Sequence, residues 1–342
     1  MLSSVKKNAA NALELCGIDD KSYRDGIIKT ANTLREMNDI VIVCHKSPDG
    51  DTLGSAAALC RGLRSLGKRA NVKCADEIPQ KYSFMFDSLN EQDIVPQHFV
   101  SVDVAAPHLM GTLESEYGDK IDVCIDHHRM NSVNADVKFV DDTASATGEI
   151  IWILLKAMGV EPDKSMAACL FAAISTDTGC FKYSNVTIRT HLIAIQLMKL
   201  EIDCAGINFK LIDEETPSKL TLKNMALSTL DYYCGGKCAV ITITTEMMTK
   251  SEAMPEDMDG VASIPRSISG VECGITMKQD GTAWKISVRS TDKINAADLC
   301  ARFGGGGHKA AAGCKLEMNY DDAKAQLVSA VTEMLGISAE KN

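Results

Sequence analysis

Short apolar runs rich in β-branched residues alternate with helical patterns through the first half of the chain. These runs occupy residues 40–44, 69–76, 98–104 and 121–128. Helical segments or loops separate them, and strands that alternate with helices are typical of a parallel sheet with helices on both faces. The pattern therefore predicts an α/β fold for this half of the chain.

Helices are predicted where apolar residues recur every three or four positions. Residues 1–38 hold helices ahead of the first strand, and residues 53–66 form a helix that ends at Gly67. A further helix covers residues 163–174. Glycine often follows the last helical residue because it adopts a positive φ without strain.

The pattern of the chain changes near residue 235. Beyond it, apolar runs predict a strand at 237–244 and two more strands at 270–278 and 282–290. The last two are joined through residues 279–281, which have the composition of a hairpin turn. A helix at 294–303 and a final amphipathic helix that ends at Gly336 complete a smaller α+β domain.

These patterns divide the chain into three predicted regions. Residues 1–190 form a catalytic α/β domain with a helical N-terminal extension. Residues 191–233 have helical periodicity and few strand signals, and they are predicted to be a helical connector. Residues 234–342 form the smaller domain, which is predicted to bind substrate.

Polar side chains follow several of the predicted strands. His45 ends one run, Asp103 ends another, and Asp126-His127-His128 ends a third. The carboxyl ends of parallel strands meet at one edge of a sheet, so we expect these side chains to lie close together. Asp177 follows the predicted helix at 163–174 and is a further candidate. Imidazole and carboxylate groups are suitable ligands for a divalent metal ion.

Asp49 and Asp51 follow His45 in a Pro-Asp-Gly-Asp turn and have three interpretations. One is a helix N-cap within a turn. A calcium loop is the second, but Leu53 and Cys60 occupy positions that require oxygen ligands. The third is a magnesium or transition-metal site shared with other strand ends, and His45 makes this the favoured interpretation.

Asp126, His127 and His128 form the second constellation. Adjacent histidines at a strand end point in different directions, so one can bind a metal ion while the other faces substrate. The preceding aspartate can accept a ring N–H and fix the tautomer. A single histidine would more often be a hydrogen-bonded core residue, but this triplet favours a functional role.

A run of four glycines, followed by His308 and Lys309, is the third constellation. Gly305, Gly306 and Gly307 lie in this run, and successive N–H groups in such a segment can bind an anion. No Ser or Thr follows the lysine, so the sequence is not a phosphate-binding P-loop. A flexible loop is the alternative, and phosphate or nucleotide binding is favoured.

Two arginines precede the glycine run, and both are candidate phosphate ligands. A guanidinium group binds phosphate through two hydrogen bonds. Arg289 ends an alternating strand just ahead of the glycines, which makes it a stronger candidate than Arg266. Either arginine taken alone would more often be an ordinary surface residue.

Composition and charge narrow the classes of partner. A net charge of −10 disfavours a broad basic surface for long duplex nucleic acid and favours a short anionic substrate. The thirteen cysteines are scattered singly in apolar runs, so we expect buried thiols rather than disulfides. The chain shows neither a signal-peptide pattern nor a membrane-spanning run, so a cytoplasmic location is expected.

Taken together, these motifs resemble the DHH phosphoesterase superfamily. The match covers roughly residues 25–320. The glycine run resembles the glycine-rich motif of the DHH-associated C-terminal domain. The residues that match the four N-terminal motifs, in order, are His45, Asp49, Asp51, Asp103, Asp126, His127, His128 and Asp177.

The resemblance implies a two-metal phosphoesterase whose active site lies in the cleft between the domains. It implies two Mn²⁺ ions, for which Mg²⁺ or Co²⁺ can substitute. One ion would take His45, Asp49 and Asp103. The other would take Asp51, Asp103, His127 and Asp177, with Asp103 as the bridge. His128 would contact the scissile phosphate, while Arg289 and the Gly304–His308 segment would hold the remaining phosphate and base.

Within this superfamily the two-domain length is most similar to the NrnA-type oligoribonucleases. They hydrolyse short oligonucleotides and the nucleotide 3′,5′-bisphosphate pAp, so the same substrates are expected here. Hydrolysis of cyclic or linear dinucleotides is an open alternative, and a RecJ-like single-strand exonuclease is a weaker one. An alternative from a different functional class is a nucleotide-binding regulator without catalytic activity. No membrane partner is expected, and the motifs are compatible with a homodimer.

Overall fold

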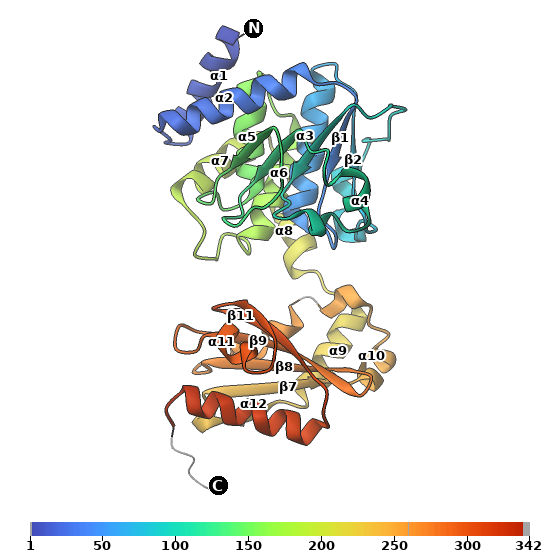
Figure 1. The fold of residues 1–342 in the computed structure, drawn as a ribbon, viewed down its shortest axis with the longest axis vertical. Helices are drawn as coiled ribbons and strands as arrows, with labels where there is room; N and C mark the ends of the chain where they lie inside the picture. Colours follow the sequence, from blue (N-terminus) through green and yellow to red (C-terminus); the bar gives the residue numbers. More distant parts are fainter. Residues whose placement is uncertain (1, 259, 338–342) are drawn as a thin grey trace. The chain divides into compact units, whose positions relative to one another are not determined.

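The structure is a computed structural model that describes residues 2–258 and 260–337. It divides into two compact units, one up to Glu214 and one from Glu215 onward (Figure 1). The segment predicted as a connector is therefore shared, because residues 191–214 belong to the first unit and residues 215–233 to the second.

The sheet of the first unit is parallel throughout, as the sequence predicts. Its strand order is β2-β1-β3-β4-β5. The sequence does not predict the fifth strand, since its short apolar run is interrupted by the exposed Lys138. The strands are β1 (Ile40–Val43), β2 (Ala70–Lys73), β3 (His98–Val102), β4 (Val123–Asp126) and β5 (Val137–Val140).

Helices cover the two faces of this sheet unequally. Ile40 and Ile42 of β1 pack into a large core with the long helices, whereas Val41 and Val43 face a smaller core that includes Tyr117 of α4. The α-helices are α1 (Leu2–Leu15), α2 (Lys21–Glu36), α3 (Gly50–Ser65), α4 (Glu114–Tyr117), α5 (Thr147–Met158), α6 (Lys164–Asp177), α7 (Ile188–Met198) and α8 (Cys204–Asn208). Gln80–Phe86 and Pro107–Leu113 are 3₁₀-helices, and Phe209–Asp213 is a π-helical turn.

Two helices are longer than predicted, and both extensions bring ligand candidates into helices. Helix α3 starts at Gly50 because Asp49 caps it, accepting hydrogen bonds from the N–H groups of Asp51 and Thr52. Helix α6 continues to Asp177 instead of ending near residue 174. The two helices pack closely at Gly54, where a Cβ atom would lie 2.4 Å from the carbonyl oxygen of Cys169.

The second unit contains a six-stranded mixed sheet of order β10-β11-β9-β8-β7-β6. Only β7 and β8 pair in parallel. Pairing of β8 with β9 reaches Asp280 and Ala283, so the predicted hairpin turn is formed by Gly281 and Thr282. The strands are β6 (Asp231–Tyr233), β7 (Cys238–Ile243), β8 (Cys273–Asp280), β9 (Ala283–Ser290), β10 (Gly306–His308) and β11 (Ala311–Leu316).

One face of this second sheet is fully covered and the other only partly. Helices α11 (Ala296–Ala301) and α12 (Tyr320–Met334) pack on the covered face, in a core with Ile286 and Val288. On the opposite side, α9 (Pro217–Leu227), α10 (Thr245–Ser251) and Val261 pack over β7 (Figure 1). Short 3₁₀ turns lie at Cys234–Gly236, Pro255–Met258, Val261–Ser263 and Pro265–Ser267.

All thirteen cysteines are free thiols, as expected, and eight of them are buried. In residues 2–258 and 260–337 no helix is both long enough and apolar enough to cross a membrane.

Candidate metal centre

Six predicted metal ligands meet at one edge of the first sheet. His45 follows β1, Asp103 follows β3, and His127 follows β4, while Asp51 lies in the first turn of α3. Asp49 caps α3 and Asp177 ends α6. The strand ends thus supply one side of the cluster, and two helix termini supply the other.

His45 lies between two carboxylates. Its Nε2 is 3.5 Å from Asp49 Oδ1 and 3.6 Å from Asp103 Oδ2. Asp103 is buried and has a φ of 60°. A left-handed conformation is strained for aspartate, and such strain persists where the surrounding structure requires it.

His127 faces three carboxylates. Its Nε2 lies 3.2 Å from Asp177 Oδ2, 3.7 Å from Asp103 Oδ1 and 3.9 Å from Asp51 Oδ2. Its Nδ1 is 3.2 Å from the carbonyl oxygen of Ala144. If Nδ1–H donates to that carbonyl, Nε2 keeps a lone pair directed at the cluster, which is the usual arrangement for a metal-binding histidine.

The potential ligand atoms fall into three groups, each within 4.8 Å. His45, Asp49 and Asp103 form one group, which matches the first predicted ligand set. The other groups are Asp51-His127-Asp177 and Asp103-His127-His128. Asp103 and His127 each belong to two of the groups, and the second predicted ligand set is divided between the two groups that contain His127.

The carboxylate of Asp51 is held by the first turn of α5, which sequence reasoning missed. The N–H groups of Thr147 and Gly148 donate to it at 2.6 and 2.9 Å, and the Ser55 hydroxyl donates at 3.0 Å. The Thr147 hydroxyl donates to Asp103 at 2.9 Å. The positive end of α5 therefore orients two candidate ligands at once.

A buried ion-pair network fixes this first turn of α5. Arg189 donates from Nε to Glu149 at 2.6 Å and from Nη1 to Asp141 at 2.8 Å. The other oxygen of Glu149 accepts a hydrogen bond from Ser145. Asn185 then donates to the backbone carbonyls of Ser145 and Asp177, which ties the network to another candidate ligand. The signal for Arg189 is weak in the sequence, because its two carboxylate partners are 40 and 48 positions away.

Electrostatics within the cluster shift several pKa values. Burial and the nearby charges of Asp103 and Asp177 raise the pKa of Asp51 well above its usual range. Burial raises the pKa of Asp177 to about 7, against the opposing effect of His127. Burial lowers the pKa of His45, but hydrogen bonds to Asp103 and Asp49 outweigh it and raise that pKa to about 11.

This chemistry fits a metal site. Several carboxylates are gathered in a buried space where they repel one another, and no lysine or arginine of the described chain forms a salt bridge with any of them. Divalent cations neutralise such a cluster and need deprotonated oxygen and imidazole ligands. The donor set of two histidines and four aspartates therefore fits a divalent metal ion.

The histidine next to this cluster is oriented by the aspartate of the triplet. His128 Nδ1 is 2.8 Å from Asp126 Oδ1, and this hydrogen bond raises the pKa of His128 to about 9. Asn131 donates to the other carboxylate oxygen of Asp126. The side chain of His128 is 49% exposed, compared with 15% for His127. The two histidines thus differ in access to solvent.

The predicted substrate residues lie in the second unit. The glycine run is not an open loop, because Gly306–His308 forms β10 and pairs with Ala311–Gly313. A Cβ at Gly305 would lie 2.2 Å from the Gly313 carbonyl oxygen, and Gly307 has a φ of 145°. Gly306 is different, since a Cβ there would meet nothing within 4 Å.

The two arginines both lie next to Gly274. Arg289 is opposite Gly274 in the β8–β9 register, and a Cβ on Gly274 would lie 2.5 Å from the backbone nitrogen of Arg266. The Nε atom of Arg266 is buried and has no hydrogen-bond partner in the described chain. His308 is exposed, and Lys309 pairs with Asp292 at 3.0 Å.

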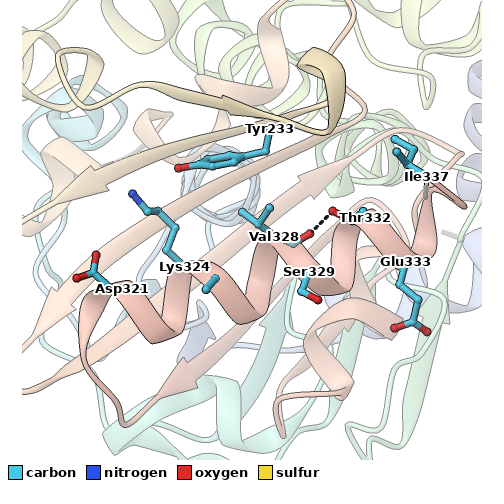
Figure 2. Close-up of a pocket in the computed structure, with 9 residues that line it drawn as sticks. Tyr233, Asp321, Lys324, Val328, Ser329, Thr332, Glu333 and Ile337 are labelled. Carbon is cyan, nitrogen blue, oxygen red and sulfur yellow. Dashed lines mark hydrogen bonds between the residues drawn. The ribbon is translucent and has the colours of Figure 1, made fainter. Parts of the chain in front are cut away.

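A surface pocket of about 750 Å³ lies along α12 in the same unit. Figure 2 shows Tyr233 above the helix, with Lys324 and Val328 beneath it. None of the predicted site residues lines this pocket. It therefore plays no part in the site described above.

The first domain gathers histidines and aspartates at the carboxyl edge of a parallel sheet, and the second domain is built on a mixed sheet. These two features define a class of two-domain phosphoesterases. The chain belongs to the DHH family. The DHH family N-terminal domain matches residues 39–174, and the DHHA1 domain matches residues 235–336.

Curated relatives place the chain within one branch of this family. It is 30% identical to the bifunctional oligoribonuclease and PAP phosphatase NrnA of Thermus thermophilus, over 86% of this chain and 90% of that protein. It is 22% identical to the protein of the same name from Bacillus subtilis, over 85% of this chain and 93% of that one. The chain is a phosphoesterase of the NrnA type.

Solved structures agree on the fold. An exopolyphosphatase-related protein from Bacteroides fragilis matches with a TM-score of 0.80 and 27% identity, covering 92% of this chain and 96% of that one. RecJ from Thermus thermophilus, solved with Mn²⁺, matches with a TM-score of 0.53 and 16% identity. That match covers 96% of this chain and 59% of RecJ, and it supports the fold alone.

Proposed function

We propose that this protein hydrolyses short oligoribonucleotides to mononucleotides and pAp to AMP, with two Mn²⁺ ions as cofactors. Three ligand groups, each with its atoms within 4.8 Å of one another and linked through the shared residues Asp103 and His127, carry the proposal. The names of the NrnA relatives support this choice of substrates. When bound, divalent ions supply Lewis-acid activation of the phosphoryl group.

The proposed ligand sets are those that the resemblance implies. His45, Asp49 and Asp103 would hold one ion, and Asp51, Asp103, His127 and Asp177 would hold the other. Magnesium prefers all-oxygen sites, whereas imidazole suits transition metals. The two histidines therefore favour a transition metal over Mg²⁺. The choice of Mn²⁺ among transition metals follows the resemblance, with Mg²⁺ or Co²⁺ as substitutes.

The remaining residues of the site act on the substrate. His128 presents its free Nε2 to the scissile phosphate, and Asp126 holds the ring in that orientation through the 2.8 Å hydrogen bond. Thr147 and Ser55 keep the carboxylates of Asp103 and Asp51 aligned. Such fixed donors lower the cost of reorganisation during reaction.

We assign recognition of the rest of the substrate to the second unit. Arg289 and Arg266 provide guanidinium groups for the second phosphate, and the vacant space at Gly306 admits a close approach to the backbone. His308 is the last residue of β10, the strand that contains Gly306, and Lys309 follows it directly. Gly305 and Gly307 keep the hairpin closed behind it.

A substrate panel tests the proposal. The protein is incubated with Mn²⁺ and, separately, pAp, a dinucleotide, a 20-mer RNA and cyclic di-AMP. We expect turnover of pAp and the dinucleotide and slow or no turnover of the other two. Activity on the 20-mer without activity on pAp or the dinucleotide would contradict the proposal. Activity on cyclic di-AMP alone would favour a cyclic dinucleotide phosphodiesterase.

The same preparation tests the inactive-regulator alternative. Metal analysis after incubation with Mn²⁺ should find two ions per chain, and a protein that binds none would support that alternative. A cytoplasmic location and a homodimer remain predictions, which cell fractionation and sedimentation would check.

A further inference from the structure

The sheet of the second unit leaves part of one face uncovered. Alternate residues of β9 and β11 point to this face, and none of them is a large apolar residue. All of them are partly or fully exposed. They are Lys285, Ser287 and Arg289 of β9 and Ala311, Gly313 and Lys315 of β11.

The register arranges this open face in three rows. Arg289, Ala311 and His308 form the first row, which is the predicted substrate end. Ser287, Gly313 and Gly306 extend the second row across to β10. Lys278, Lys285 and Lys315 form the third row, because Lys285 pairs with both of the others. This third row is called the lysine row below.

The lysine row brings three cations from three strands side by side. Lys285 and Lys315 share a single counter-ion, Asp280, at 3.4 and 3.3 Å. Lys278 has no ion-pair partner among residues 2–258 and 260–337. Neighbouring like charges on a sheet repel one another. The row therefore carries excess positive charge in a chain whose net charge is −10.

The distance between the rows suits a nucleic acid strand. Lys285 and Arg289 are four residues apart on β9, which is about 13 Å at 3.3 Å per residue. A stacked strand rises about 3.4 Å per nucleotide, so this distance corresponds to about four nucleotides. The small residues between the two ends let a backbone lie close to the sheet.

We propose that the open face is a second binding site, at which the lysine row contacts the phosphates of a single-stranded oligonucleotide that extends beyond its terminal nucleotide. The inference rests on the proposed function and adds a determinant of substrate length to it. A dinucleotide is too short to reach the row, whereas an oligonucleotide of five residues reaches it. The contacts are with phosphates, so they are independent of base sequence.

The test compares two double variants of equal charge change. K285Q/K315Q removes two members of the lysine row. K250Q/K293Q removes two lysines with similarly exposed side chains, each paired with a glutamate elsewhere in the same unit. For each variant, kcat/KM is measured with a dinucleotide and a five-residue RNA under Mn²⁺, over a series of salt concentrations.

We expect K285Q/K315Q to lower kcat/KM for the five-residue RNA about tenfold and to leave the dinucleotide within about twofold. For the longer substrate, the plot of log(kcat/KM) against the logarithm of salt concentration should become less steep by about 1.4. This corresponds to two lost phosphate contacts, at about 0.7 per contact on a single strand. The K250Q/K293Q control should behave like the parent. D280N should act in the opposite direction and tighten binding of the longer RNA.

Binding is also measured directly, by fluorescence anisotropy with end-labelled RNAs of both lengths in the presence of EDTA. A parent protein that hydrolyses neither substrate overturns the proposed function, while anisotropy still tests the lysine row. If both double variants bind the five-residue RNA equally well, or if K285Q/K315Q weakens both lengths equally, the inference is wrong. Either result leaves the proposed catalytic function intact.

Discussion

The metal-ligand edge of the first unit and the open face of the second unit use charge in opposite ways. At the first, carboxylates such as Asp51 and Asp103 are buried and each accepts hydrogen bonds from neighbouring elements. At the second, lysines and arginines are exposed or half-buried and have few partners. A buried charged group needs fixed hydrogen-bond partners, whereas an exposed charged group is solvated and can bind a mobile ligand. Substitutions should therefore have large effects at the first region and small, salt-dependent effects at the second.

The largest effect is expected at Asp103, which two ligand groups share. Asp103→Asn keeps the size of the side chain but removes the charge. Residues that merely support a metal ligand contribute about 10–100-fold to activity or affinity, so we expect a loss of more than about 100-fold in kcat. Hydrolysis of pAp under saturating Mn²⁺ measures it. D142N, at an exposed aspartate that pairs with Arg129, is the matched control. Near-normal activity of D103N would refute the ligand assignment.

Arg189→Gln should be the most destabilising of these changes. It leaves Asp141 and Glu149 buried without their cation, a situation that costs about 3–5 kcal/mol. Urea denaturation of the metal-free parent and variant measures the change in the free energy of unfolding. The control is R302Q, which breaks a solvent-exposed pair with Glu333 and should cost about 1 kcal/mol or less. Equal losses for the two variants would mean that the buried network does not hold α5 as described.

Metal affinity should fall as the pH falls. In the metal-free protein, hydrogen bonds to carboxylates outweigh burial and raise the pKa of His45 to about 11, and burial raises that of Asp177 to about 7. Binding of Mn²⁺ must displace protons from these raised groups, so its dissociation constant should rise about tenfold per pH unit for each proton displaced. Calorimetry between pH 8 and pH 6, in buffers of different ionisation enthalpy, counts the protons. An affinity that is constant with pH would contradict this description of the cluster.

Two glycine substitutions separate folding from substrate binding in the second unit. G305A places a methyl group against the Gly313 carbonyl and should destabilise the unit, whereas G306A has free space and should melt like the parent. If substrate approaches Gly306 closely, G306A should lower kcat/KM by about 10–100-fold, as a misplaced substrate does. Thermal melts and pAp hydrolysis on both variants check this. A fully active G306A would remove the glycine run from the substrate site.

Much of this arrangement is predictable from the sequence, because buried strands leave clear apolar runs. β1 through β4 and the polar residues at their ends were predicted on that basis, and the structure brings His45, Asp103 and His127 together. Strand β5 was missed because four residues with an exposed lysine give little signal. Whether a strand is predictable from the sequence therefore depends on how much apolar surface it buries.

The supporting residues could not be predicted from one sequence. Thr147 holds Asp51 through its backbone N–H, which any residue but proline provides, and its hydroxyl reaches Asp103 across 44 positions. Arg189 and Asn185 act across 40 or more positions, through contacts that depend on how α5 and α7 pack. The glycine run was predicted to admit substrate, but two of its glycines are required by the hairpin itself. Tertiary packing, rather than local pattern, determines all three.

The most direct test of the central claim is the rate of AMP release from pAp as a function of Mn²⁺ concentration, starting from protein treated with EDTA. We predict negligible release without metal, a saturable rise on addition of Mn²⁺, and no recovery for D103N at the concentration that saturates the parent. Release that is unaffected by EDTA, or equal in the parent and D103N, would contradict a metal centre built on Asp103.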